Sequence, residues 1–129
     1  MPLGQIKENK MKKIILITML ISALFAQSDC NKENWQEYYN SDGRDMSDCQ
    51  LQGAMLRGAR LMGADLTGAD LTGANFTQSR LMGADLIGAN FTGANFTGAK
   101  LVGIISGDIR GVPDNLPEGW SLVDGTLIK

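Results

Sequence analysis

The sequence predicts an all-β solenoid built from short extended sides joined by tight corners. A five-residue period runs from residue 49 to residue 103, and residues 59–78 and 79–98 differ at only five of twenty aligned positions. A period of five fits neither the 3.6-residue period of an α-helix nor the two-residue alternation of a long strand. Because twenty residues make four five-residue sides, we expect each coil of the solenoid to have four sides.

Each five-residue unit places a small residue two positions before a large one. Residues two apart face the same side of an extended segment, so both point inward and the polar residue between them points outward. A glycine closes most units at a corner. The large residues are Leu51, Leu56, Leu61, Leu66, Leu71, Phe76, Leu81, Leu86, Phe91, Phe96 and Leu101, and the small ones are Cys49, Ala54, Ala59, Ala64, Ala69, Ala74, Ser79, Ala84, Ala89, Ala94 and Ala99.

With its A-(D/N)-L-x-x signature, this block resembles the pentapeptide-repeat family. The resemblance implies a right-handed quadrilateral parallel β-helix, with nearly three coils over residues 49–103. Residues twenty apart then stack about 4.8 Å apart. The expected stacks are Phe76 on Phe96, Leu71 on Phe91, and a column of Leu61, Leu81 and Leu101.

Residues 27–48 lack the repeat and predict an N-terminal cap. Trp35, Tyr38 and Tyr39 recur at helical spacing, which indicates a short amphipathic helix over the first coil. Such a cap is needed because the end of a solenoid exposes its core.

Residues 104–129 predict a C-terminal cap. Two short strands flank Asp124-Gly125, a dipeptide that favours a hairpin turn. Trp120 and Leu122 are expected to cover the last coil. A similar stretch adjoins repeat blocks in bacterial members of the family.

Residues 1–26 have the pattern of a secretory signal. Four lysines precede an apolar run at residues 14–26. A spanning helix needs about 20 apolar residues, so a stable transmembrane anchor is not expected. The alternatives are a membrane tether formed by an uncleaved signal and a buried core helix. Met11 is an alternative start, and cleavage after Ala26 would leave 8 basic and 13 acidic residues, a net charge of −5.

The two cysteines, Cys30 and Cys49, remain after such a cleavage. An even cysteine count in a small exported protein favours a disulfide. A disulfide between these two cysteines would close a loop of about 20 residues and stabilise the protein by about 3 kcal/mol. The alternative is two unpaired buried thiols.

The composition argues against an enzyme. Histidine is absent, which removes the commonest general base and metal ligand. No nucleophile and base can be paired for a hydrolase, and no cofactor motif is present. The spacing of Asp42, Asp45 and Asp48 does not match a calcium loop, so we expect a solvated turn and no metal.

Several other motifs follow from the repeat itself. The glycosylation sequons at Asn75, Asn90 and Asn95 arise from the residue types that the repeat uses, and we assign them no function. Met55, Met62 and Met82 are expected to be packing or rim residues.

One outward row is a candidate interaction surface. It contains Arg60, Arg80 and Lys100, flanked by Met62, Met82 and Val102. Such a row suits a partner protein or an anionic glycan. It is alternatively a by-product of coil duplication, because Asp65 and Asp85 on the next side are expected to pair with the arginines and neutralise them.

These observations predict a non-catalytic exported structural or protein-interaction module, whose partner is an unidentified protein or envelope component and not a nucleic acid. The resemblance offers an alternative, a cytoplasmic topoisomerase-binding protein that mimics DNA. Residues 49–103 argue against it, since they carry three aspartates against four basic residues. Duplex DNA carries one negative charge per roughly 1.7 Å of axis.

Overall fold

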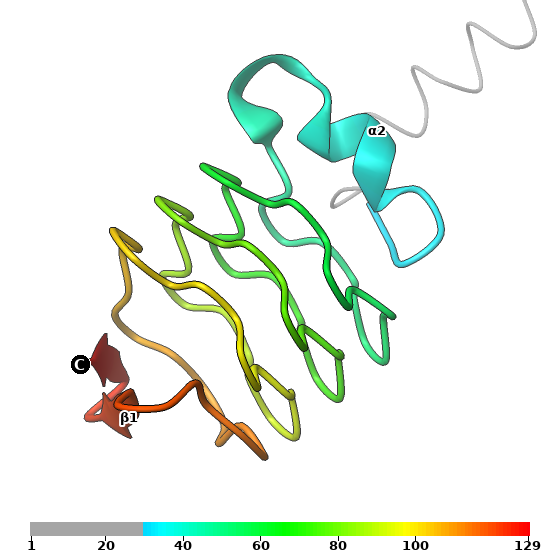
Figure 1. Cartoon of the computed structure of the whole chain (residues 1–129). Helices are drawn as coiled ribbons and strands as arrows, with labels where there is room; N and C mark the ends of the chain where they lie inside the picture. Colours follow the sequence, from blue (N-terminus) through cyan, green and yellow to red (C-terminus); the bar gives the residue numbers. More distant parts are fainter. Residues whose placement is uncertain (1–29) are drawn as a thin grey trace, which may run out of the picture.

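The computed structural model describes residues 30–129 and shows a stack of coils (Figure 1). Within this range no helix has both the length and the apolar character needed to cross a membrane. The predicted signal segment, residues 1–26, and the alternative start at Met11 lie outside the described residues.

The coils are held in register by parallel bridges between residues twenty apart, at every fifth residue from Asp45 to Asn115. Each coil therefore has four sides, which we number in chain order. Side 1 comprises residues 44–48, 64–68, 84–88 and 104–108, and side 2 comprises 49–53, 69–73, 89–93 and 109–113. Side 3 comprises 54–58, 74–78, 94–98 and 114–118, and side 4 comprises 59–63, 79–83 and 99–103.

The backbone N–H groups of one unit are distributed over three coils. In residues 69–73 the second N–H donates to the preceding coil at 2.9 Å, and the third and fifth donate to the next coil at 2.9 and 2.8 Å. The first N–H of the following unit closes the corner at 3.0 Å. Only the fourth N–H has no backbone acceptor, so it needs water or a side chain.

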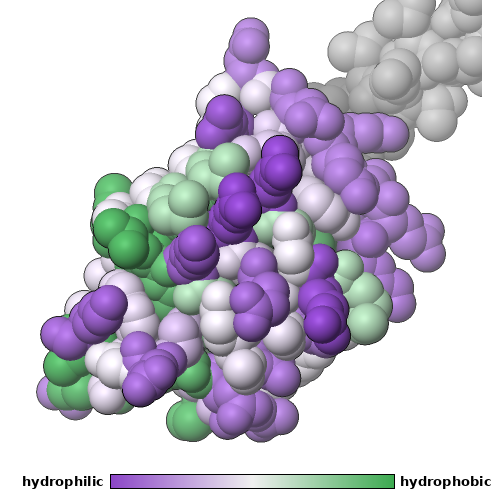
Figure 2. All heavy atoms as spheres, in the orientation of Figure 1, coloured by the Kyte–Doolittle hydropathy of each residue, from purple (hydrophilic) through white to green (hydrophobic). Residues whose placement is uncertain are grey.

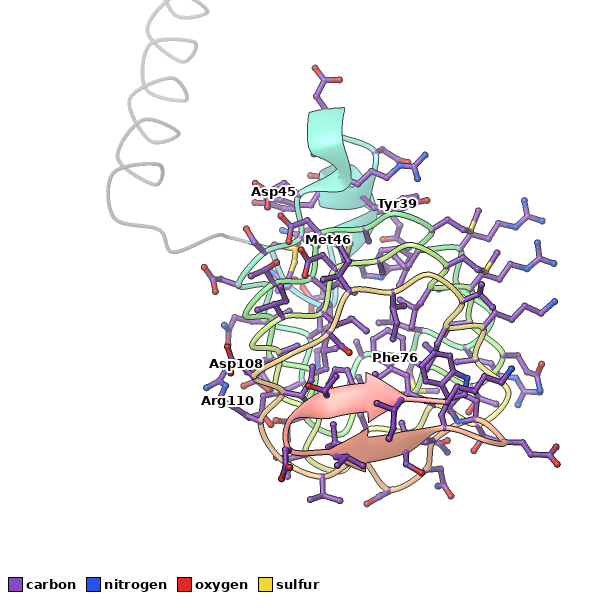
Figure 3. All side chains as sticks on the ribbon, turned by 90° about the vertical axis from the view of Figure 1, so that its left-hand side faces the viewer. Tyr39, Asp45, Met46, Phe76, Asp108 and Arg110 are labelled. Carbon is purple, nitrogen blue, oxygen red and sulfur yellow. A yellow bond between two sulfur atoms is a disulfide. The ribbon has the colours of Figure 1, made fainter. Side chains whose placement is uncertain are left out.

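The interior is filled by the third residue of each unit, with the small first residue beside it. Phe76 and Phe96 stack with ring centroids 4.8 Å apart and an interplanar angle of 6°, as the twenty-residue period predicts. Phe96 also contacts Phe91 from the adjacent side at 4.7 Å. Figure 3 looks along the coils and shows Phe76 inside the ring of ribbon.

The bridged coils extend past both ends of residues 49–103. Met46 occupies a third position on side 1 and is fully buried. Its N–H donates to the backbone carbonyl of Asp65 at 2.8 Å, as the N–H groups of the third residues of later units do to the next coil. At the other end, Ile105 and Arg110 also bridge to the preceding coil.

The N-terminal segment packs on the first coil through helix α2 (Trp35–Tyr39) and the 3-10 helix η1 (Asp42–Arg44). The helix contains the three aromatic residues that predicted it, and all three are partly buried against the core cluster. Figure 1 shows α2 and η1 beyond the first coil.

The C-terminal segment ends in the expected hairpin. Strands β1 (Ser121–Val123) and β2 (Thr126–Ile128) pair antiparallel, with Leu122 opposite Leu127. Leu127 is buried, and Trp120 and Leu122 are partly buried against the core. The N–H of Leu127 donates to Ser106 Oγ at 3.1 Å, which joins the hairpin to the last coil. Figure 3 shows the two strands across the coil end.

Candidate functional site

The basic ladder, defined as Arg60, Arg80 and Lys100, runs along side 4 parallel to the coil axis. Parallel bridges join Arg60 to Arg80 and Arg80 to Lys100, so adjacent members lie one coil apart. All three side chains are exposed. Figure 2 shows a row of strongly hydrophilic residues along the coils, with a hydrophobic row beside it.

The apolar row beside the ladder consists of Met62, Met82 and Val102, the fourth residues of the same units. The two methionines are half-buried, whereas Val102 is 68% exposed. Side 4 therefore presents one column of cations and one column of apolar groups, with no acidic residue among its fifteen positions.

At seven of the twelve second positions on the other three sides, the residue has a structural role. Its Oδ1 atom accepts the fourth N–H of the same unit, the donor that the backbone leaves unpaired; we call this bond the side-chain cap. Six of the seven caps on sides 1 to 3 receive an N–H at 2.9–3.0 Å, and the seventh at 3.1 Å. The capping residues are Asp45, Asp65, Asp70, Asn75, Asp85, Asn90 and Asn95.

Side 4 lacks the side-chain cap in all three of its units. A lysine or arginine has no acceptor atom, so the N–H groups of Met62, Met82 and Val102 find no hydrogen-bond partner within residues 30–129. A net hydrogen bond contributes about 0.5–1.5 kcal/mol. The basic ladder is therefore placed where the fold would favour Asp or Asn.

The expected neutralisation of the ladder by side 1 is wrong. Asp65 and Asp85 direct Oδ1 to the N–H groups of their own units, at 3.0 Å in both cases. In the described part of the chain, no ion pair joins Arg60 or Arg80 to a carboxylate. The cap uses only Oδ1 of each carboxylate, and an exposed ion pair through the other oxygen would contribute little.

The N-terminal segment contacts the first unit of side 4. In later coils the fourth carbonyl accepts an N–H from the coil before it, a partner that Met62 does not have. The hydroxyl of Tyr39 donates to the Met62 carbonyl at 3.2 Å, and the Arg44 guanidinium donates to the same oxygen. The Arg44 guanidinium also lies 5.1 Å from the centroid of the Tyr39 ring. The first unit of side 4 is thus held in place without using the ladder.

The structure brings Cys30 and Cys49 together as a disulfide, with Cα atoms 4.8 Å apart. Cys49 is the inward first residue of its unit, and the Cys30 carbonyl accepts the N–H of Gln50 at 2.9 Å. Both cysteines are fully buried. The pair joins the N-terminal segment to the interior of the first coil.

Hydrogen bonds lower the pKa of two capping carboxyls. The hydroxyl of Ser47, with its N–H, lowers the pKa of Asp45. For Asp70, desolvation favours the neutral acid, but bonds from Thr72 and Gln52 together with the charge of Arg110 outweigh it and lower the pKa. Ionisation of these groups is therefore coupled to folding.

The remaining motifs receive structural roles. The amides of Asn75, Asn90 and Asn95 each accept both the N–H and the hydroxyl of the sequon threonine. Asp45 caps its own unit, and within residues 30–129 no three metal-ligating residues are grouped to hold an ion. Met55 is 79% exposed on side 3, away from Met62 and Met82.

Sequence reasoning missed two features of the repeat block. Met46 is buried one unit before the predicted start, and its spacing of five residues from Leu51 would have revealed it. Gln78 takes a corner with φ +60, where most units have glycine. The adjacent Ser79 hydroxyl is buried with no hydrogen-bond partner among residues 30–129.

Comparison with known families agrees with this geometry. A family model for pentapeptide repeats matches residues 45–83 and 69–105, with eight copies. This chain belongs to the pentapeptide-repeat family. Its coils form a right-handed β-helix, and the capping residues are the Asp and Asn of the repeat signature.

Solved pentapeptide-repeat proteins are similar to parts of the chain. One from the thylakoid lumen of Arabidopsis thaliana is 27% identical with a TM-score of 0.47, over 58% of this chain and 56% of that one. Another, from the cyanobacterium Cyanothece 51142, is 33% identical with a TM-score of 0.37, over 53% of this chain and 44% of that one.

A third, from Nostoc Pcc 7120, is 25% identical with a TM-score of 0.32, over 74% of this chain and 93% of that one. The chain thus spans little more than half the length of the Arabidopsis protein and less than half of the Cyanothece one. No curated protein sequence matches the chain.

Proposed function

We propose that this pentapeptide-repeat protein is an exported, non-catalytic binding module whose contact surface is the basic ladder with its apolar row. One observation carries the proposal. On three successive coils, side 4 has a cation at the position where an Asp or Asn would cap the backbone. All three units of side 4 lack the stabilising side-chain cap. This favours a role for the three cations in binding a partner and not in stabilising the fold.

Coil duplication alone does not account for the ladder. Arg60 and Arg80 lie at equivalent positions of the two copies, 59–78 and 79–98. Lys100 lies beyond both copies, and it keeps the charge with a different side chain. Position 102 likewise keeps an apolar residue while changing from methionine to valine.

The charge distribution supports an anionic partner. Residues 30–129 contain 8 basic and 12 acidic residues, a net charge of −4, yet side 4 carries three cations and no acid. Side 1 carries five aspartates, Asp45, Asp48, Asp65, Asp85 and Asp108. A partner attracted to side 4 is therefore repelled by the adjacent side, which fixes its position.

Export is proposed from two features. Residues 1–26 have the pattern of a secretory signal, and the Cys30–Cys49 disulfide would persist in an oxidising compartment. In this proposal the N-terminal segment with α2 and the C-terminal hairpin act as caps for the β-helix. An intact mass from each cell fraction tests export: a chain beginning near Gln27 and two hydrogens lighter supports it, whereas a full-length reduced chain in the cytosol contradicts it.

DNA mimicry receives no support from the acidic side. The aspartates of side 1 that form a column are spaced one coil apart, about 4.8 Å, far sparser than the charges of duplex DNA. Three of them, at positions 45, 65 and 85, are capping residues.

The contact surface is tested by changing Arg60, Arg80 and Lys100 together to Asn. Asparagine restores the side-chain cap, so the variant should fold with equal or higher stability while partner capture is lost. The matched control is Arg57→Thr, because Arg57 is an exposed cation on side 3 whose equivalents in later coils are Thr77 and Thr97. Capture that survives the triple substitution, or is lost equally in the control, would contradict the proposal.

A further inference from the structure

We infer that the basic ladder binds an acidic polysaccharide that lies parallel to the coil axis, with one acidic sugar per coil. This inference rests on the proposed function and specifies its ligand. It is argued from the width of the ladder, its spacing and the apolar row beside it.

The ladder is a single residue wide. On one edge it meets side 1, with five aspartates, and on the other it meets side 3, whose later coils present Asn75, Asn95 and their capped threonines. A planar anionic membrane would face a molecule of net negative charge, and this repulsion acts over a screening length of about 8–10 Å. A single linear chain contacts the cations and avoids the acidic side.

The spacing of the ladder selects among linear anions. The backbone positions of adjacent ladder residues lie about 4.8 Å apart, and the three span about 10 Å. Same-face side chains of an extended acidic peptide recur at about 6.6–6.8 Å, and phosphates along one strand of duplex DNA recur at about 3.4 Å of axis. A linear anion whose successive charges face side 4 and advance by about one coil spacing would meet all three cations.

The chemistry of side 4 fits an acidic sugar. The guanidinium groups of Arg60 and Arg80 can each bind a carboxylate through two parallel hydrogen bonds. No ion pair within residues 30–129 occupies either group, so both are available. Met62, Met82 and Val102 lie alongside and offer apolar contact to the C–H face of a sugar ring.

The test is titration calorimetry of the purified full chain with oligogalacturonates of two to six sugars. Affinity should rise up to three sugars and then level off, because three coils carry a cation. The affinity of the triple Asn variant for these oligosaccharides should be about tenfold lower or more. The affinity of the Arg57→Thr variant should be unchanged. Binding should weaken with salt, and neutral xylo-oligosaccharides should not bind.

Parallel titrations separate failure of the inference from failure of the proposed function. If inorganic polyphosphate or phosphatidylserine vesicles bind through the ladder and oligogalacturonates do not, the polysaccharide inference is overturned and the contact surface stands. If the wild-type chain and the triple variant bind each of these probes equally, both the polysaccharide inference and the proposed contact surface are contradicted. Equal affinity for neutral and acidic sugars also overturns the inference.

Discussion

Asn75 Oδ1 accepts a hydrogen bond from the N–H of Thr77 at 3.0 Å and another from its hydroxyl at 2.6 Å. This contact between residues two apart explains why the repeat alphabet favours Asp or Asn between the small and the large residue. It also makes side 4 unusual, because Arg80 stands at the same position and cannot accept.

We expect Arg80→Asn to stabilise the fold by about 0.5–1.5 kcal/mol, since the new amide can cap the Met82 N–H. Asn75→Ala should destabilise by a similar amount because it removes an existing cap. Chemical denaturation of both variants checks the pair. If Arg80→Asn is neutral while Asn75→Ala is destabilising, water serves the Met82 N–H as well as an amide would.

Ser79→Ala should stabilise the protein by about 1–3 kcal/mol, because the Ser79 hydroxyl is fully buried and has no hydrogen-bond partner in the described part of the chain. The matched control is Ala99→Ser one coil away, which should destabilise. Thermal unfolding distinguishes the two. A loss of stability in Ser79→Ala would mean that the hydroxyl is satisfied in solution.

Gln78→Gly should stabilise by about 1 kcal/mol, because Gln78 takes the left-handed corner conformation that glycine adopts at lower energy. The converse control is Gly58→Ala. Gly58 has φ +68, and a Cβ there would meet nothing within 4 Å. Any loss of stability in the Gly58→Ala variant therefore reports backbone strain alone. Unchanged stability in this variant would show that these corners tolerate side chains.

Replacing both Cys30 and Cys49 by serine should lower the free energy of unfolding by about 3 kcal/mol, the stabilisation that chain entropy gives to a loop of this length. Reductant should lower the stability of the wild type and leave the variant unchanged. Equal sensitivity of both proteins to reductant would show that the cysteines are not paired in solution.

Acid should destabilise the fold partly through Asp70. Hydrogen bonds from Thr72 and Gln52 and the charge of Arg110 outweigh desolvation and hold its folded pKa below the ordinary value of 3.8. The ionised form therefore stabilises the fold above pH 3.8, and this contribution is lost as the pH falls through the folded pKa. Asp70→Asn keeps the cap without the charge, so its stability should depend less on pH below about pH 4. Identical pH profiles for variant and wild type would exclude this contribution.

The sequence predicts the parts of this fold that depend on spacing alone. The stack of Phe76 on Phe96 follows from counting twenty residues, as do the inward side chains of the block. The Phe91–Phe96 contact between adjacent sides depends on side-chain orientation at a corner, which no period encodes.

The position of the contact surface could be predicted from the sequence, but the hydrogen-bond partners of the residues around it could not. Asp85 caps the Ile87 N–H with Oδ1. Whether its other oxygen also reaches an arginine depends on the geometry of the unit, which no period encodes. The Tyr39 and Arg44 bonds to the Met62 carbonyl likewise join segments with no common periodicity.

The fixed separation of twenty residues between bridged positions limits how such a chain can grow. Inserting one five-residue unit between Arg80 and Lys100 would turn every later residue by one side, so the lysine would move to side 1 and the row of cations would be interrupted. Inserting a whole coil such as residues 59–78 would instead add one more cation in line. The reach of the surface along a bound polymer is therefore a length that gene duplication can change only in whole-coil steps.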